Sequence, residues 1–248
     1  AKGPNVQQSM NVGSYQPNAW GFFDMHGNVW EWVNDFYEKY PTGSLTNPTG
    51  SALGSLWAYR GGGWFHGGDC TRSAKRHHHD ADGRYADVGF RVSLQQTRVP
   101  QSKVPTPGNP WTVPTASIEM IWCKPGAFTM GSPKNEMGHG FDVHGKKIDE
   151  TQHRVAFTKG FHLGKYEVTQ AQWKKVMGSN PSRFKSDKRP IEFVGWKEAK
   201  NFCQKLTILE RKAGRLPDGW QYTLPTEAQW EYACRAGTTT ATAFGDSL

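Results

Sequence analysis

The sequence has no apolar run that approaches the roughly 18 residues a membrane-spanning helix needs, so no transmembrane segment is expected. Cysteine is scarce, and none of Cys70, Cys123, Cys203 and Cys234 forms a CxxC pair. A zinc ribbon or a thioredoxin-type site is therefore excluded, and Cys203 and Cys234, which lie on apolar helix faces, are expected to be buried free thiols. A dense basic stripe is also missing, because the net charge of +8 comes from Lys and Arg scattered among acids. We therefore expect no nucleic-acid partner.

Aromatic residues and turn formers are abundant instead. The 248 residues include 11 Trp, 28 Gly and 15 Pro, with 36% hydrophobic and 21% charged residues. This composition indicates a globular α+β protein in which aromatic side chains hold irregular segments in place. A chain of this length forms one large domain or two small ones.

A proline-rich stretch divides the chain. Residues 95–117 have almost no apolar periodicity, and we expect a semi-rigid linker or terminal extension on the surface. It separates residues 1–94, rich in Gly, Trp and Asn, from residues 118–248.

Helices are predicted in the second part of the chain. The first begins at Thr169 and ends at Gly178, and the second spans 196–212 with an apolar stripe. The third has the capping-box pattern of Thr226 and Gln229, with Gly237 as its expected C-cap. The apolar stripe of the second helix comprises Ala199, Phe202, Cys203, Leu206 and Leu209.

Short strands are predicted in both parts. Residues 118–131 and 153–164 each indicate two strands around a turn. Residues 58–64 indicate a strand that ends in a glycine corner, and residues 88–92 indicate another strand.

Several motifs together resemble the formylglycine-generating-enzyme-like (sulfatase-modifying-factor) family. They are FTMGS (128–132), YEVTQAQW (166–173), PIEFVGWKEAKNFC (190–203), YTLPTEAQWEYACRAG (222–237), NAWGFFDMHGNVWEW (18–32), RGGGW (60–64) and VGFRV (88–92). The resemblance implies an α+β, C-type-lectin-like fold with little regular secondary structure.

The order of the motifs is permuted relative to the family. Residues 1–94 resemble the closing half of the domain, and residues 118–248 resemble its opening half. A circular permutant, a tandem array sampled out of phase, or a numbering that reorders or drops a loop would each explain this order. In each case we expect the two halves to pack into one globule, with Trp30 and Trp32 near the helix that bears Trp230.

The resemblance does not extend to the oxidising chemistry of the family. Oxidising members use a pair of cysteines after the glycine corner to bind copper and convert a substrate cysteine to formylglycine. Here His66 stands at the first of these positions, the second falls near Gly68, and Cys70 is the one cysteine of the segment. One thiol cannot make that site, so we expect a protein that is not an enzyme and requires no cofactor.

The same segment resembles the variable region of diversity-generating-retroelement target proteins, which use this fold as a scaffold. The residues between Trp64 and Val88 that suggest variation can all be encoded by a codon whose first two bases are free and whose third base is C. Such codons are the expected result when the adenines of asparagine codons are randomised. Residues interleaved with these positions, including Arg72, Arg76, Phe90 and Arg91, match scaffold positions that would stay fixed. The expected ligand-binding positions are Phe65, His66, Asp69, His77, His78, His79, Asp80, Asp82, Tyr85 and Asp87. All of them except His78 are expected to be largely exposed on one face, with Trp64, Arg72, Arg76 and Phe90 packed or hydrogen-bonded beneath it.

Two segments of the sequence contain residue types that can bind a metal ion. Consecutive side chains alternate in an extended segment, so at most His77 and His79 share a face, and we expect no functional metal there. The family resemblance implies a possible structural calcium ion, with ligands at the aligned residues Asp24, Gly27, Val29 and Glu31.

The sequence therefore predicts a non-catalytic protein that displays a hypervariable surface to an unknown protein or other macromolecular ligand. A generic family domain of unknown function is the alternative, and a copper-dependent oxidase of protein cysteine is the third candidate. We expect a monomer located at the cell surface or outside the cell, as the resemblance implies.

Overall fold

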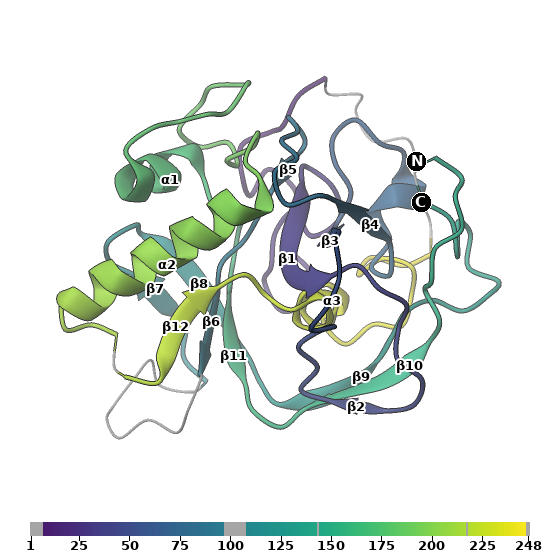
Figure 1. Cartoon of the computed structure of the whole chain (residues 1–248). Coiled ribbons are helices and arrows are strands. Elements are labelled where there is room, and N and C mark those ends of the chain that lie inside the picture. The colour runs from purple at the N-terminus through teal and green to yellow at the C-terminus, as the bar shows by residue number, and fades with distance from the viewer. Residues whose placement is uncertain (1–6, 97–107, 143, 217, 247–248) are drawn as a thin grey trace.

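The computed structural model describes residues 7–96, 108–142, 144–216 and 218–246 (Figure 1). In these ranges the chain forms three sheets, three α-helices and one short 3-10 helix, joined by irregular segments. The α+β class expected from the composition is confirmed.

One sheet contains strands from the first part of the chain only: β1 (Trp30–Phe36), β3 (Trp57–Arg60), β4 (Arg76–His79) and β5 (Val88–Gly89). Its order is β4-β3-β1-β5. β1 pairs antiparallel with β3 and parallel with β5, and β3 pairs antiparallel with β4. This sheet carries the segment in which variation is predicted.

The other two sheets combine both parts of the chain. The three-stranded sheet contains β2 (Leu45–Thr46), β10 (His153–Phe157) and β9 (Gly126–Met130), in that order. The five-stranded sheet contains, in order, β12 (Trp220–Thr223), β6 (Ser93–Gln96), β11 (Phe161–Gly164), β8 (Ile118–Cys123) and β7 (Trp111–Val113). Because β2 and β6 pair with strands of the second part, backbone hydrogen bonds join the two parts.

The three helices begin where the sequence predicts. They are α1 (Gln170–Met177), α2 (Trp196–Lys212) and α3 (Glu227–Arg235). Thr169 and Thr226 each complete a capping box with the glutamine three residues later. The expected C-cap of α3 is off by one position, because Ala236 takes the left-handed conformation at φ 47° and Gly237 follows it. None of these helices combines the length and apolar character that crossing a membrane requires.

Two of the predicted strand pairs are not hairpins. β8 and β9 flank the turn at 124–125 but belong to different sheets, and so do β10 and β11. β9 pairs with β10 and β8 pairs with β11, so two bent segments run alongside each other. The local pattern predicted the strands, but the pairing depends on distant residues.

The proline-rich stretch is more structured than expected. Residues 97–107 lie outside the described part of the chain. Trp111–Val113 forms the edge strand β7, and Val113 and Ala116 are fully buried. Pro110 and Pro114 flank this strand, where a missing N–H donor does not interrupt the ladder. The linker prediction is therefore wrong for residues 111–116.

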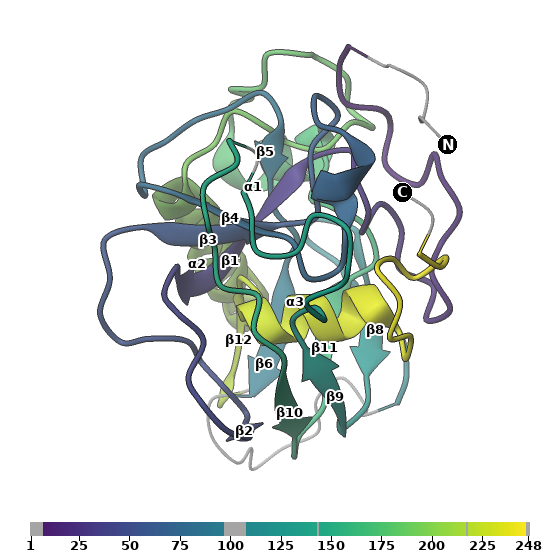
Figure 2. The same cartoon turned by 90° about the vertical axis from the view of Figure 1, so that its right-hand side faces the viewer.

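Helix α3 connects the two parts of the core. It lies between the four-stranded sheet and β9 (Figures 1 and 2). The indole of Trp230 on this helix donates to Glu31 of β1 at 3.0 Å. Trp30 and Trp32 therefore lie on the strand that contacts this helix, as expected.

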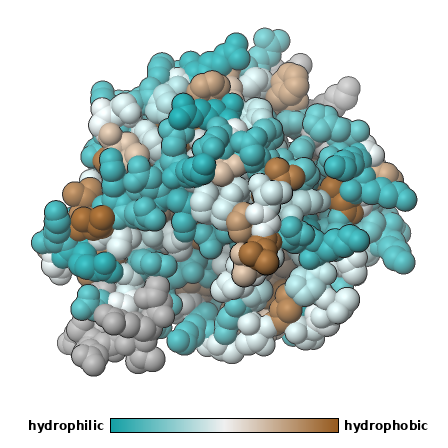
Figure 3. Space-filling model, viewed as in Figure 1, coloured by the Kyte–Doolittle hydropathy of each residue, from teal (hydrophilic) through white to brown (hydrophobic). Residues whose placement is uncertain are grey.

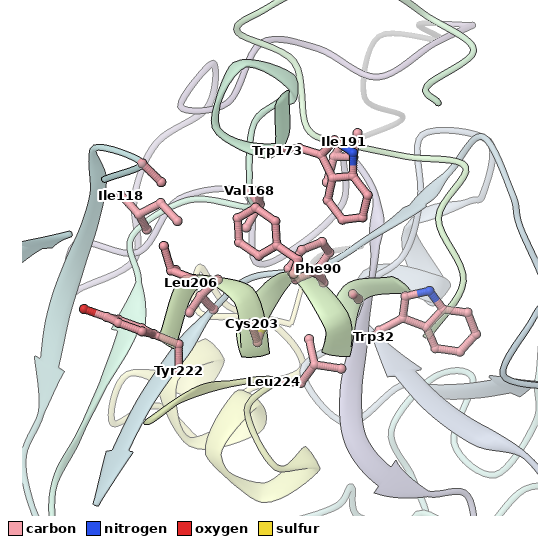
Figure 4. Close-up of a cluster of buried hydrophobic side chains, with 14 of the residues drawn as sticks. Trp32, Phe90, Ile118, Val168, Trp173, Ile191, Cys203, Leu206, Tyr222 and Leu224 are labelled. Atoms are coloured by element: carbon pink, nitrogen blue, oxygen red, sulfur yellow. The ribbon is translucent and has the colours of Figure 1, made fainter. Parts of the chain in front are cut away.

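A large hydrophobic cluster surrounds Phe90 (Figure 4). The Phe90 ring lies 5.4 Å from Phe202 of α2, which stacks on Trp173 of α1 at 5.5 Å. The predicted stripe of α2 is confirmed except at Leu209, which is 39% exposed, while Glu210 is buried. After three turns the period of 3.6 residues brings position 210 to the inner face instead.

Candidate binding surface

A glycine corner starts the candidate surface. Gly61 and Gly62 follow β3 with φ of +100° and +80°, a region that favours glycine. A Cβ atom on Gly62 would lie 2.8 Å from the carbonyl oxygen of Cys70. The corner therefore brings residues 64–71, including the 3-10 helix Gly68–Thr71, close against β3.

Buried arginines fix the backbone beneath this surface. Arg72 makes two 2.9 Å hydrogen bonds to Glu150, and Arg76 binds both carboxylate oxygens of Glu227 at 2.6 and 2.8 Å. Arg60 bridges Glu227 and Glu231. The side chains of Arg60, Arg72 and Arg76 are at most 2% exposed. Paired, bidentate geometry is what allows guanidinium groups to be buried.

The scaffold residues expected beneath the surface are packed or hydrogen-bonded there. Arg72, Arg76 and Phe90 are buried as predicted. Trp64 is only half-buried; its indole donates to the Ala86 carbonyl at 3.1 Å and its ring lies 5.6 Å from Phe184. Replacing Trp64 should therefore cost less stability than replacing Phe90.

Most of the predicted ligand-binding positions are accessible to solvent. Phe65 is 76% exposed, and Asp69, Asp80 and Asp82 are also exposed. The remaining accessible positions are half-buried: His66, His78, His79, Tyr85 and Asp87. We call these nine accessible residues together the display surface.

His77 is the exception, because it is buried at 8% exposure. It sits opposite Tyr59 in the β3–β4 ladder, and the two rings stack with centroids 5.1 Å apart. Burial lowers the pKa of His77 to about 4, so this ring is neutral at physiological pH. The exposure expected for His77 is therefore wrong, and the residue belongs to the core of the sheet.

Contacts link several members of the display surface. His66 Nδ1 lies 3.4 Å from an Asp87 oxygen and accepts a 3.2 Å hydrogen bond from the Trp30 indole. The Tyr85 hydroxyl contacts the His79 imidazole, whose other nitrogen lies 2.8 Å from Asp80. Burial raises the pKa of Asp87 and lowers the pKa of His66, so burial favours the uncharged form of both groups.

Residues 133–142 and 144–146 border this surface, a contact that no sequence pattern predicted. The carbonyl of Gly138 accepts from Arg72 at 2.7 Å, and the ring of His144 lies 5.7 Å from His77. Met137 is 63% exposed and Phe141 is 46% exposed. The sequence signal for this contact was the presence of two apolar residues, Met137 and Phe141, in a glycine-rich loop.

Figure 3 shows a mostly hydrophilic face on which hydrophobic residues are scattered singly. Such isolated residues are normal for a protein surface.

Two of the expected calcium ligands, Glu31 and Asp24, have protein partners in the structure. Both Glu31 oxygens are bound by Arg91 at 2.6 Å, so its charge is already neutralised. Asp24 instead neighbours Glu167, and burial raises the pKa of both carboxyls. In the described residues no cluster of three or more His, Cys, Asp or Glu side chains could hold a metal ion. Glu31 thus lies in an ion pair and Asp24 beside a second carboxyl group, and the structural calcium ion stays a prediction.

The cysteine near the surface does not suit thiolate chemistry. Cys70 is 4% exposed, and burial raises the pKa of its thiol to about 11. A reactive or metal-binding cysteine needs a thiolate at working pH. Cys203 and Cys234 are buried free thiols, as expected, and so is Cys123.

Comparison with known proteins gives partial relatives. The chaperone protein LppX of Paenibacillus barcinonensis is 40% identical over 102 residues, which cover 31% of this chain and 36% of LppX. The structure of PvdO from Pseudomonas aeruginosa matches at 27% identity and a TM-score of 0.42, covering 55% of this chain and 54% of PvdO. Treponema denticola variable protein 1 matches at 31% identity and a TM-score of 0.33, covering 34% of this chain and 31% of that one.

This chain thus spans only about a third of the length of LppX. A family model, however, matches nearly the whole chain. It describes the Sulfatase-modifying factor enzyme 1-like domain and covers residues 3–96 and 108–246. The chain therefore belongs to the sulfatase-modifying factor, or formylglycine-generating-enzyme-like, family.

Proposed function

We propose that this protein is a non-catalytic binding protein that presents the display surface, varied by a diversity-generating retroelement, to a macromolecular ligand. One observation carries the proposal. Accessible positions such as Phe65 and Asp80 lie on either side of buried, ion-paired arginines such as Arg72 and Arg76 in the same short segment. A position can accept many side chains only where packing does not restrict it, whereas core positions respond to a single methylene.

The chemistry of the surface suits binding to a protein. Phe65 and Tyr85 provide aromatic contact area, and histidines and aspartates provide hydrogen bonds and charge. A rigid scaffold beneath them limits the entropy that is lost on binding. The proposal includes a monomer that acts at the cell surface or outside the cell.

A generic domain of the same family is the alternative. It would have the same fold and buried arginines, but its accessible positions would not vary between genes. A copper-dependent oxidase is less well supported, because His66 replaces the first expected cysteine and the Cys70 thiol is buried. Incubation of the copper-loaded protein with a cysteine-containing peptide should yield no formylglycine, and its formation would favour the oxidase.

The proposal is tested first on the gene. We expect a nearby reverse transcriptase gene and an adenine-rich copy of the segment that encodes residues 64–91. Between isolates, substitutions should concentrate in codons of the display surface and spare those of Arg72, Arg76 and Phe90. Substitutions spread evenly over accessible positions elsewhere, such as those of α2, would support the generic domain instead.

A pair of libraries tests the same idea on the protein. Random substitution at Phe65, Asp69, Asp80 and Asp82 should leave most clones folded, because surface changes usually stay within about 0.5 kcal/mol each. The same randomisation at Arg72, Arg76, Phe90 and Arg91 should leave almost none folded. Resistance to protease on the surface of yeast measures the folded fraction. Equal losses in both libraries would show that the accessible positions are structural.

A further inference from the structure

A separate cavity lies away from the display surface. Its volume is about 430 Å³, a size that accommodates a small molecule. It is bounded by the end of β1, the segment 38–51, β9, β10 and the first turn of α3. Much of its wall is apolar: Phe36, Tyr40, Pro41, Leu45, Met130 and Ala228. None of the predicted ligand-binding residues lines this cavity.

Asp35 is the polar group that marks the cavity. Its side chain is at the end of β1 and only 5% exposed. Oδ2 accepts a 2.8 Å hydrogen bond from the backbone N–H of Glu227. Within the described part of the chain, Oδ1 has no hydrogen-bond partner. A carboxylate oxygen in an apolar surrounding is unfavourable unless a donor meets it.

The neighbouring cations do not provide that donor. Arg76 uses Nε and Nη2 on Glu227, and its Nη1 donates to the carbonyls of Glu38 and Asp149. Arg60 is held by Glu227 and Glu231. Burial and the charge of Glu227 raise the pKa of Asp35 to about 7. The carboxyl is therefore poised to ionise when a cation arrives.

The other titratable groups around Asp35 come from several elements. Glu227 comes from α3, Arg60 from β3 and Arg76 from β4, and all three are tied to one another. The groups that line the rest of the cavity are Glu38, Lys39, Tyr40 and His153. Glu38 and Lys39 are exposed and opposite in charge, so they do not favour an anion at the entrance.

We propose that this cavity binds a small organic amine, whose ammonium group donates to Oδ1 of Asp35 and whose apolar body packs against the aromatic and aliphatic wall. A charge-assisted hydrogen bond is shorter and stronger than a neutral one, and an ammonium group also neutralises the buried carboxylate. The inference is independent of the proposed function, because no residue of the display surface takes part.

Three probes of one shape test the charge preference. Phenethylamine, 2-phenylethanol and phenylacetate are titrated against the full chain at pH 7.5 by calorimetry. We expect the amine to bind at least tenfold more tightly than the alcohol, and phenylacetate not to bind at the same concentrations. Equal affinity for amine and alcohol, or no binding of the amine at 10 mM, would overturn the proposal.

Asp35→Asn tests the residue itself. The Asn side-chain oxygen can still accept from Glu227 N–H, but the charge is lost, so the preference for the amine should disappear. The matched control is Asp187→Asn, which removes an exposed carboxylate outside both the cavity and the display surface and should change nothing in this assay. An unchanged affinity in a folded Asp35→Asn variant would contradict the proposal.

The pH dependence of the wild type gives a readout that needs no variant. Below a pKa of about 7 the carboxyl holds a proton that the amine must displace. Affinity for phenethylamine should therefore rise as the pH increases from 6 to 8, by nearly tenfold per pH unit at the lower end. A simple amine stays charged throughout this range, because its pKa is near that of lysine, about 10.4. A flat profile would overturn the proposal even if Asp35→Asn fails to fold.

Discussion

Replacement of Glu31 by Gln should lower the free energy of unfolding by about 3–5 kcal/mol, because it leaves the buried Arg91 without its counter-charge. Both side chains of this pair are fully buried. Arg91 also donates to the carbonyls of Gly164 and Phe23, so the same guanidinium holds three segments together. The side-chain NH2 group of Gln would face an N–H donor of the Arg91 guanidinium, where Glu31 places an acceptor oxygen. Urea unfolding followed by tryptophan fluorescence measures the loss.

The control for this variant is Asp82→Asn. Asp82 pairs with Lys197 at 2.8 Å, but both side chains are mostly exposed, and surface pairs of this kind contribute little to stability. A small effect of Glu31→Gln, similar to that of Asp82→Asn, would show that the ion pair is not important for the fold. Addition of EDTA to the wild type separates the calcium interpretation, which alone predicts that the chelator destabilises the protein.

The second large effect is expected at Phe90. Phe90→Ala should cost about 3–5 kcal/mol, because the ring is fully buried between Trp173 and Phe202 and its loss leaves a cavity. Phe65→Ala removes the same ring from the same region of the sequence, yet Phe65 is 76% exposed. That change should stay within about 0.5 kcal/mol. Thermal unfolding of both variants provides the comparison.

The effect of Phe65→Ala should appear in ligand binding and not in stability. Phe65→Ala removes an aromatic group of the display surface and should weaken binding of the macromolecular ligand while the fold persists. A large loss of stability in Phe65→Ala would assign that ring a structural role. Retention of full stability in Phe90→Ala would contradict the placement of this residue in the core.

Local signals in the sequence were sufficient for the helices. Thr169 and Thr226 satisfy backbone N–H groups within the same turn, so a helix start depends on a few adjacent residues. The burial of Arg72 and Arg76 was also expected, but only from the family resemblance. Their partners Glu150 and Glu227 lie 78 and 151 residues away, and no local pattern identifies them.

The composition, the caps and the family motifs thus determined the α+β class, the helices and the segment that forms the display surface. Tertiary structure alone decided which side chains of that segment face solvent. His77 was expected to be exposed, but strand pairing places it against Tyr59. Residues 133–142 and 144–146 join the surface through the contact of Gly138 with Arg72, and the cavity at Asp35 exists because α3 meets the end of β1. Each of these contacts joins residues far apart in the chain, and such contacts depend on how the sheets pack, which a local sequence pattern does not encode.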